Sequence, residues 1–259
     1  MPESSLSRIP CLIDDILPTH RVHLLAGVSD AGKTRFVIPA MLDWALGKPV
    51  LERPSHPKPW AYVIGDRTKR EAEGTMSDMG IDIDAIPCIP AFGQDRKTAN
   101  EILLAAQRMT PQPQLLVWEG FHDAPDGERK KDVQSFLSRM AMHCEDERAF
   151  PKGLTILGIC ESPKLKPAER YPNPRQRVSG VSAWGFHSST IILIENIEND
   201  PSYLQPQRII WICSKIAIRR QVLATFNEKG RLVATDQPVP NKKRSSSKEP
   251  ITLTFPLSK

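Results

Sequence analysis

The strongest constraint on the fold is a glycine-rich segment of eight residues near the amino terminus. Residues 27–34 read GVSDAGKT and match the pattern G-x-x-x-x-G-K-[ST]. A short apolar run at 22–26 precedes the segment, and a stretch with helical character at 35–46 follows it. A strand, this loop and a helix together predict a phosphate-binding loop, whose backbone N–H groups face a phosphate. A chance match is the weaker alternative, because both flanking elements have the expected type.

The loop predicts ATP and Mg²⁺ as the cofactors. Lys33 is expected to neutralise charge on the β- and γ-phosphates, and the hydroxyl of Thr34 is expected to bind Mg²⁺. The residues expected to contact the nucleotide are Gly27, Ser29, Asp30, Ala31, Gly32, Lys33, Thr34 and Arg35.

Two acidic residues that follow apolar runs are candidates to complete this site. Glu119 follows the run 114–118 and is expected to help hold Mg²⁺, whereas Asp66 follows the run 60–64 and is expected to orient the attacking water. The alternatives are a solvent-facing acid at the end of a strand for Glu119, and a cap of the next helix for Asp66.

Strands and helices alternate along most of the chain, which predicts an α/β fold. Expected strands are 22–26, 60–64, 86–91, 114–118, 154–160 and 189–195, and expected helices are 35–46, 68–79, 99–109 and 132–144. The segments 208–213 and 221–226 look like a hairpin-type pair, followed by 232–233. We therefore expect a mainly parallel sheet with helices on both faces and an antiparallel C-terminal extension. The expected organisation is an N-terminal arm (1–20), an ATPase domain (21–234) and a flexible basic and polar tail (235–259).

Charge and composition restrict the class of protein only in part. Lys plus Arg exceed Asp plus Glu by 35 to 30, a formal charge of +5 that permits a nucleic-acid partner without establishing one. No apolar run approaches the ~20 residues that span a bilayer, so no membrane association is expected. Five scattered cysteines without a CxxC pair indicate a reducing, cytoplasmic setting.

One basic segment is the candidate nucleic-acid contact. Such a cluster suits contacts to phosphates, and a solvated basic loop is the alternative. Its residues are Lys164, Lys166, Arg170, Arg175 and Arg177.

The order of these motifs resembles the RepA/DnaB branch of the RecA-type P-loop ATPases, the hexameric replicative helicases. The resemblance rests on the P-loop, on VIGD ending at Asp66, on LLVWE ending at Glu119, on LGICESPK and on ICSKIAIRR. It implies that Lys215, with Arg219 or Arg220, reaches the nucleotide of a neighbouring subunit. It also implies single-stranded DNA as a partner, a role in DNA replication, and a homo-oligomeric, hexameric ring. The expected catalytic residues are Lys33, Asp66, Glu119, Lys215 and Arg219.

The chain departs from that family at several acidic positions. Asp66 stands where Glu is usual, Glu119 where Asp is usual, and Glu161 where His or Gln is usual. These changes leave open a nucleotide-switched DNA-binding protein or recombination mediator with weak hydrolysis. A small-molecule kinase is a third hypothesis, although the sequence shows no arginine-rich lid segment.

Overall fold

The computed structural model describes residues 9–92, 97–125, 130–162, 182–196, 206–217 and 219–239. The strands are β1 (Cys11–Ile13), β2 (Leu17–Pro18), β3 (Val22–Gly27), β4 (Trp60–Ile64), β5 (Cys88–Pro90), β6 (Leu115–Trp118), β7 (Thr155–Glu161), β8 (Thr190–Asn196), β9 (Gln207–Ser214), β10 (Arg220–Phe226) and β11 (Leu232–Ala234). The helices are α1 (Lys33–Ala45), α2 (Lys69–Asp78), α3 (Ala99–Gln107), α4 (Lys130–Glu145) and α5 (Ser182–His187), with 3₁₀ turns η1 (Ile83–Ala85) and η2 (Phe121–Asp123).

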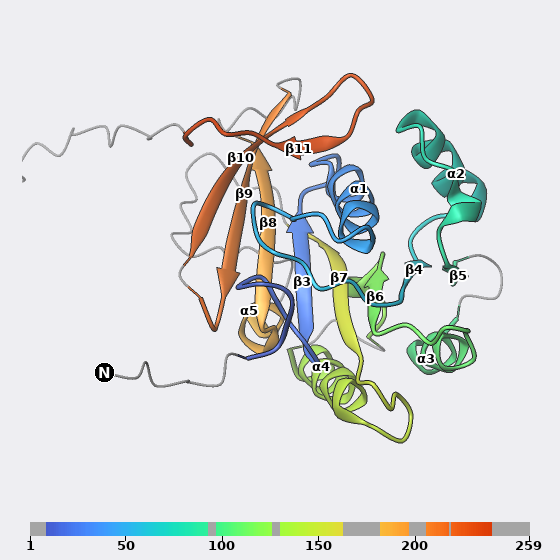
Figure 1. Ribbon diagram of the computed structural model, residues 1–259. Helices are drawn as coiled ribbons and strands as arrows, with labels where there is room; N and C mark the ends of the chain where they lie inside the picture. Colours follow the sequence, from blue (N-terminus) through green and yellow to red (C-terminus); the bar gives the residue numbers. More distant parts are fainter. Residues whose placement is uncertain are drawn as a thin grey trace, which may run out of the picture.

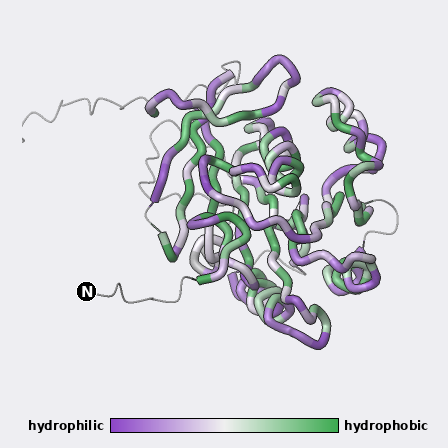
Figure 2. The backbone as a smooth tube through the Cα atoms, in the orientation of Figure 1, coloured by the Kyte–Doolittle hydropathy of each residue, from purple (hydrophilic) through white to green (hydrophobic). Residues whose placement is uncertain are grey.

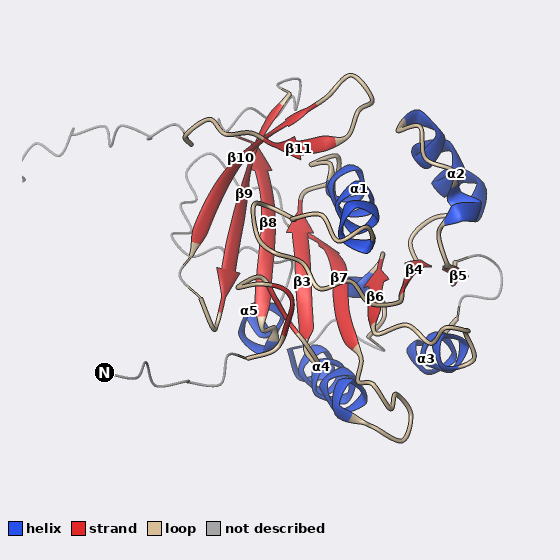
Figure 3. Cartoon of the chain, in the orientation of Figure 1, coloured by secondary structure: helices blue, strands red, loops and turns tan. Residues whose placement is uncertain are grey.

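A single large sheet organises the described part of the chain (Figures 1 and 3). Its nine strands run in the order β11-β10-β9-β8-β3-β7-β6-β4-β5. The strands from β8 to β5 are parallel to one another, and β9, β10 and β11 continue the sheet as antiparallel neighbours. This confirms the predicted parallel sheet with its antiparallel C-terminal extension. Because the parallel strands share one direction, the loops that follow β3, β4, β6 and β7 meet at one edge of the sheet.

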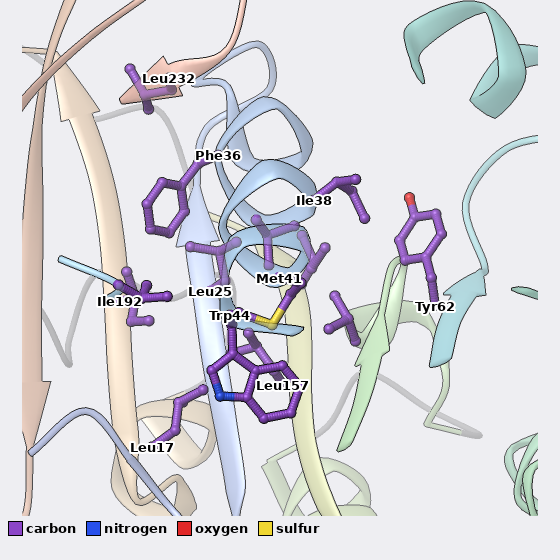
Figure 4. Packing of buried hydrophobic residues seen from close by; sticks show 14 of the residues in the cluster. Leu17, Leu25, Phe36, Ile38, Met41, Trp44, Tyr62, Leu157, Ile192 and Leu232 are labelled. Atoms are coloured by element: carbon purple, nitrogen blue, oxygen red, sulfur yellow. The ribbon is translucent and has the colours of Figure 1, made fainter. Parts of the chain in front are cut away.

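Helices cover both faces of the sheet, as the sequence predicted. Leu25 of β3 packs in a cluster with side chains of α1 and α2, whereas its neighbours Leu24 and Ala26 pack in a second cluster with α3 and α4. This alternation follows from the two-residue period of a strand. Figure 2 shows strands that are hydrophobic along most of their length. Figure 4 shows Met41 and Trp44 of α1 packed among core residues of the first cluster.

The expectation of an N-terminal arm ending at residue 20 needs correction for residues 9–20. These residues include the small β1–β2 hairpin, whose Leu12 and Leu17 are buried in the first core cluster. The indole N–H of Trp44 donates to the backbone oxygen of Leu12 at 2.9 Å. The apolar residues of this segment were assigned to an arm because two strands of two and three residues give almost no periodic signal. The segment packs against the first core cluster as part of the same domain.

Most predicted elements occur within one to three residues of the expected bounds. The exceptions are β1, β2 and α5, which are not among the expected elements. Thr68 is the N-cap of α2, where its side chain accepts a hydrogen bond from the Glu71 N–H and the Glu71 carboxylate accepts one from the Thr68 N–H. The capping alternative for Asp66 is therefore wrong, and Asp66 is available for the site.

Candidate nucleotide-binding site

The glycine-rich loop connects β3 to α1 at the carboxyl edge of the sheet. Lys33 is the first residue of α1, and its ammonium donates to the backbone oxygens of Gly27 at 3.0 Å and Val28 at 2.9 Å. Burial lowers the pKa of the Lys33 ammonium, and the carboxylates of Glu161 and Asp66 act in the opposite direction. The lysine ammonium therefore lies inside the loop, where its positive charge would lie close to a bound phosphate.

The start of α1 has the features of an anion site. Its first turn contains no acidic residue, and the N-cap residue, Gly32, provides no side chain to accept from the free N–H groups. Gly32 has φ of 93°, and a Cβ there would lie 2.6 Å from the ring of Phe226. A side chain at this position would both strain the backbone and collide with the ring, so the motif glycine is required.

Glu119 joins three elements at the centre of the site. Its carboxylate accepts hydrogen bonds from the hydroxyl of Thr34 at 2.8 Å and from the hydroxyl of Tyr62 at 2.7 Å. The residue is 1% exposed. Burial raises the pKa of the Glu119 carboxyl from 4.5 to about 7, nearby Asp66 adds to the rise, and Arg67 opposes it. The two residues predicted to bind Mg²⁺, Thr34 and Glu119, therefore lie in direct contact.

Arg67 links the two acidic candidates, and this contact has no signal in the sequence. Its guanidinium lies 2.8 Å from a Glu119 oxygen and 3.1 Å from an Asp66 oxygen. The adjacent backbones of Gly65 and Gly120 make this possible, because a Cβ on Gly65 would lie 2.1 Å from the backbone oxygen of Glu119. The ends of β4 and β6 therefore approach each other closely, which brings both acids into one site.

A cavity of about 640 Å³ opens between these elements. Its basic lining residues are Lys33, Arg35, Arg67 and Arg208. Its acidic lining residues are Asp30, Asp66, Glu119 and Glu161. Ser29, Gly32 and Thr34 also face it, so most predicted nucleotide contacts line one space. Gly27 and Ala31 do not line the cavity: the backbone oxygen of Gly27 accepts from Lys33, and Ala31 is completely buried.

The antiparallel extension closes one side of the cavity. Arg35 donates to the backbone oxygen of Gly230 at 3.2 Å, in the turn between β10 and β11. Arg231 donates to the backbone oxygen of Met79 at the end of α2, at 2.7 and 2.9 Å. Arg208 lies 5.1 Å from the centre of the Phe226 ring. Arg208, Phe226 and Gly230 were missed because they are more than 170 residues beyond the loop and carry no motif.

Lys215 and Arg219 lie away from the cavity of their own chain. Ser214, next to Lys215, pairs with Thr190 at the start of β8, whereas Gly27 pairs with Ile194 four residues further along. Four residues of strand correspond to roughly 13 Å. The guanidinium of Arg219 instead lies 4.3 Å from the centre of the Trp211 ring. Neither residue lines the cavity, so within one subunit neither can contact a nucleotide in this loop.

The predicted nucleic-acid residues fall outside the part of the chain that the structure describes. They are Lys164, Lys166, Arg170, Arg175 and Arg177. Most of the expected tail, residues 240–259, also lies outside it.

The donors present fit a magnesium ion that would accompany a nucleotide. Mg²⁺ prefers oxygen ligands and is commonly held by one or two protein groups together with substrate phosphates. The Thr34 hydroxyl and the Glu119 carboxylate supply such oxygens 2.8 Å apart. Bound there, the ion would neutralise phosphate charge. No group of three or more His, Cys, Asp or Glu side chains able to hold a metal occurs among the described residues.

The fold and the site together define the class of RecA-like P-loop ATPases. The AAA domain family matches residues 3–164, more than half of the chain, and the chain belongs to this family. No curated protein matches the chain. The fold is similar to that of a KaiC-like protein from the hyperthermophilic archaeon Pyrococcus horikoshii OT3, with a TM-score of 0.54 and 15% identity. That likeness covers 86% of this chain and 93% of the other.

Among the described residues, none of the helices combines the length and the apolar character that crossing a bilayer requires.

Proposed function

We propose that this chain is an ATP-dependent motor that acts on single-stranded DNA, the RepA-like core of a helicase in phage or plasmid replication or recombination. Its reaction is hydrolysis of ATP with Mg²⁺. Lys33 binds the phosphates, Thr34 and Glu119 hold the metal ion, and Asp66 orients the attacking water.

The observation that carries the proposal is the position of Lys215 and Arg219. These cations lie at the edge of the sheet opposite their own P-loop. A positive side chain that stabilises the transition state from another subunit is a known device of P-loop ATPases. The arrangement therefore favours a ring, with six subunits by resemblance, in which each nucleotide lies between two copies.

Support for DNA comes from the sequence that follows β7. Glu161 ends β7 and lines the cavity, and the basic segment 164–177 begins three residues later. Phosphate contacts from such a segment bind nucleic acid without sequence preference. A short connection of this kind would couple the state of the bound nucleotide to the affinity of the segment for DNA.

The test is ATP hydrolysis with and without single-stranded DNA at low salt. The wild type should be stimulated several-fold by DNA. A variant with Lys164, Lys166, Arg170, Arg175 and Arg177 changed to Gln should keep its basal rate and lose the stimulation. A basal rate that DNA leaves unchanged in the wild type would contradict a DNA motor.

A second candidate function is a nucleotide-operated switch with little hydrolysis. The ion pairs of Arg67 with Asp66 and Glu119 favour it, because they engage both acids that hydrolysis requires. Such a protein would bind ATP and change its assembly state, yet turn over slowly. Tight ATP binding, an ATP-dependent change of oligomer size and negligible turnover with DNA would support the switch.

A further inference from the structure

Both oxygens of the Glu119 carboxylate are engaged. Oε1 accepts from the Thr34 hydroxyl at 2.8 Å and lies 2.8 Å from the Arg67 guanidinium. Oε2 accepts from the Tyr62 hydroxyl at 2.7 Å. The oxygen that would bind a metal ion beside Thr34 is therefore the one that Arg67 already contacts.

Arg67 also contacts Asp66 and helix α2. Its Nε donates to Asp66 Oδ1 at 3.1 Å, and its Nη1 donates to the Thr75 hydroxyl at 3.4 Å. Its side chain is 29% exposed, whereas that of Glu119 is 1% exposed. The arginine can thus leave Glu119 toward solvent while the buried carboxylate cannot follow it.

The Arg67 guanidinium and a Mg²⁺ ion are expected to be alternative partners of Glu119, because both carry positive charge. A guanidinium and a divalent ion on one carboxylate oxygen repel each other strongly in a site of low dielectric constant. Leaving a buried carboxylate without any cation is also costly, because the ionised form loses its solvation. The most favourable arrangement is therefore one cation bound to Glu119 at a time.

We propose that Arg67 is a resident cation that competes with Mg²⁺ for Glu119, so that magnesium enters with nucleotide only when this ion pair opens. The proposal rests on the proposed binding of ATP at the same loop. It makes Arg67 a positioning residue that sets how much Mg²⁺ the protein needs. The pair holds the acid in its binding geometry until the metal arrives.

The experiment measures binding of a fluorescent ATP analogue to the full chain while free Mg²⁺ is varied. Arg67→Gln keeps a polar side chain but removes the charge. It should lower the Mg²⁺ concentration at half-maximal effect by roughly tenfold, which corresponds to a coupling of about 1.4 kcal/mol. Arg70→Gln is the matched control, because Arg70 is an exposed arginine three residues away. The control should retain the wild-type value.

Equal half-effect concentrations in the wild type and Arg67→Gln would overturn the proposal, and so would an equal shift in Arg70→Gln. Should Arg67→Gln fail to fold by circular dichroism, Arg67→Lys carries the test. A lysine keeps the charge but cannot bridge two carboxylates with a planar fork, so a smaller decrease is expected. No decrease in Arg67→Lys would then overturn the proposal. A wild type that binds no nucleotide at any Mg²⁺ concentration would instead contradict the proposed function.

Discussion

Tyr62 holds the Glu119 carboxylate from within the core. Its ring is completely buried on β4, and Figure 4 shows its hydroxyl pointing toward the carboxyl end of that strand. The hydroxyl donates to Oε2, and burial, together with the adjacent Glu119 carboxylate, raises the pKa of this tyrosine well above 10. A phenylalanine would preserve the packing and delete only the donor.

Tyr62→Phe is expected to lower the free energy of unfolding by about 2 kcal/mol, because a buried acceptor loses its partner. Urea denaturation at neutral pH measures the change. In a Glu119→Gln background the same substitution should have a smaller effect, since no charge remains to be solvated. Equal losses in the two backgrounds would show that the hydroxyl does not act through Glu119.

At this scale the sequence identified Glu119 and Asp66 but not Arg67 or Tyr62. The acids were found because each follows a buried apolar run, and ends of parallel strands meet at one edge. The other two depend on the pairing of β4 with β6, in which Tyr62 lies opposite Val117 and Val63 opposite Trp118. No local pattern contains that register, so their contacts could not be predicted.

At the scale of elements, His23 joins β3 to the N-terminal hairpin. Its Nε2 lies 2.8 Å from the backbone oxygen of Pro18, and the residue is completely buried. Burial lowers the pKa of His23 from 6.5 to about 4. Between pH 6.5 and about 4 the His23 imidazole is therefore protonated in the unfolded chain and neutral in the folded chain.

The contribution of His23 to stability is present above pH 6.5 and is lost as the pH falls toward 4. Between pH 7 and pH 4.5 the free energy of unfolding should fall by about 2 kcal/mol more in the wild type than in His23→Gln. Urea denaturation at the two pH values measures it. His187→Gln, at an exposed position, should behave as the wild type does. A fall of the same size in His23→Gln would refute the assignment.

The elements with a long periodic or apolar signal were predicted well. The bounds of β4 match the expected run, and β9 and β10 form the expected antiparallel pair. The turn of residues 227–231 connects β10 to β11. Its docking on α1 and α2 through Arg35 and Arg231 is tertiary, and the sequence holds no signal for it.

At the scale of the whole molecule, the proposed sharing of each active site between two subunits predicts complementation between inactive variants. Lys33→Ala lacks its own P-loop lysine, and Arg219→Ala lacks the cation that, in the proposed ring, would reach the nucleotide of a neighbour. Each alone should hydrolyse little ATP. Mixed in equal amounts, they should recover about a quarter of the wild-type rate. In a randomly assembled ring, about a quarter of the interfaces join an intact P-loop to an intact Arg219. A mixture as inactive as its parts would argue for sites complete within one subunit.

The most direct test of the account is steady-state hydrolysis of ATP with Mg²⁺ by the wild type, Lys33→Ala and Lys48→Ala. Lys48 is an exposed lysine paired with Asp43 at 2.7 Å and serves as the matched control. We expect hydrolysis by the wild type, a similar rate for Lys48→Ala, and a loss of at least about 100-fold in kcat/KM for Lys33→Ala. A wild-type rate in Lys33→Ala, or no hydrolysis by the wild type, would contradict an ATPase centred on this loop.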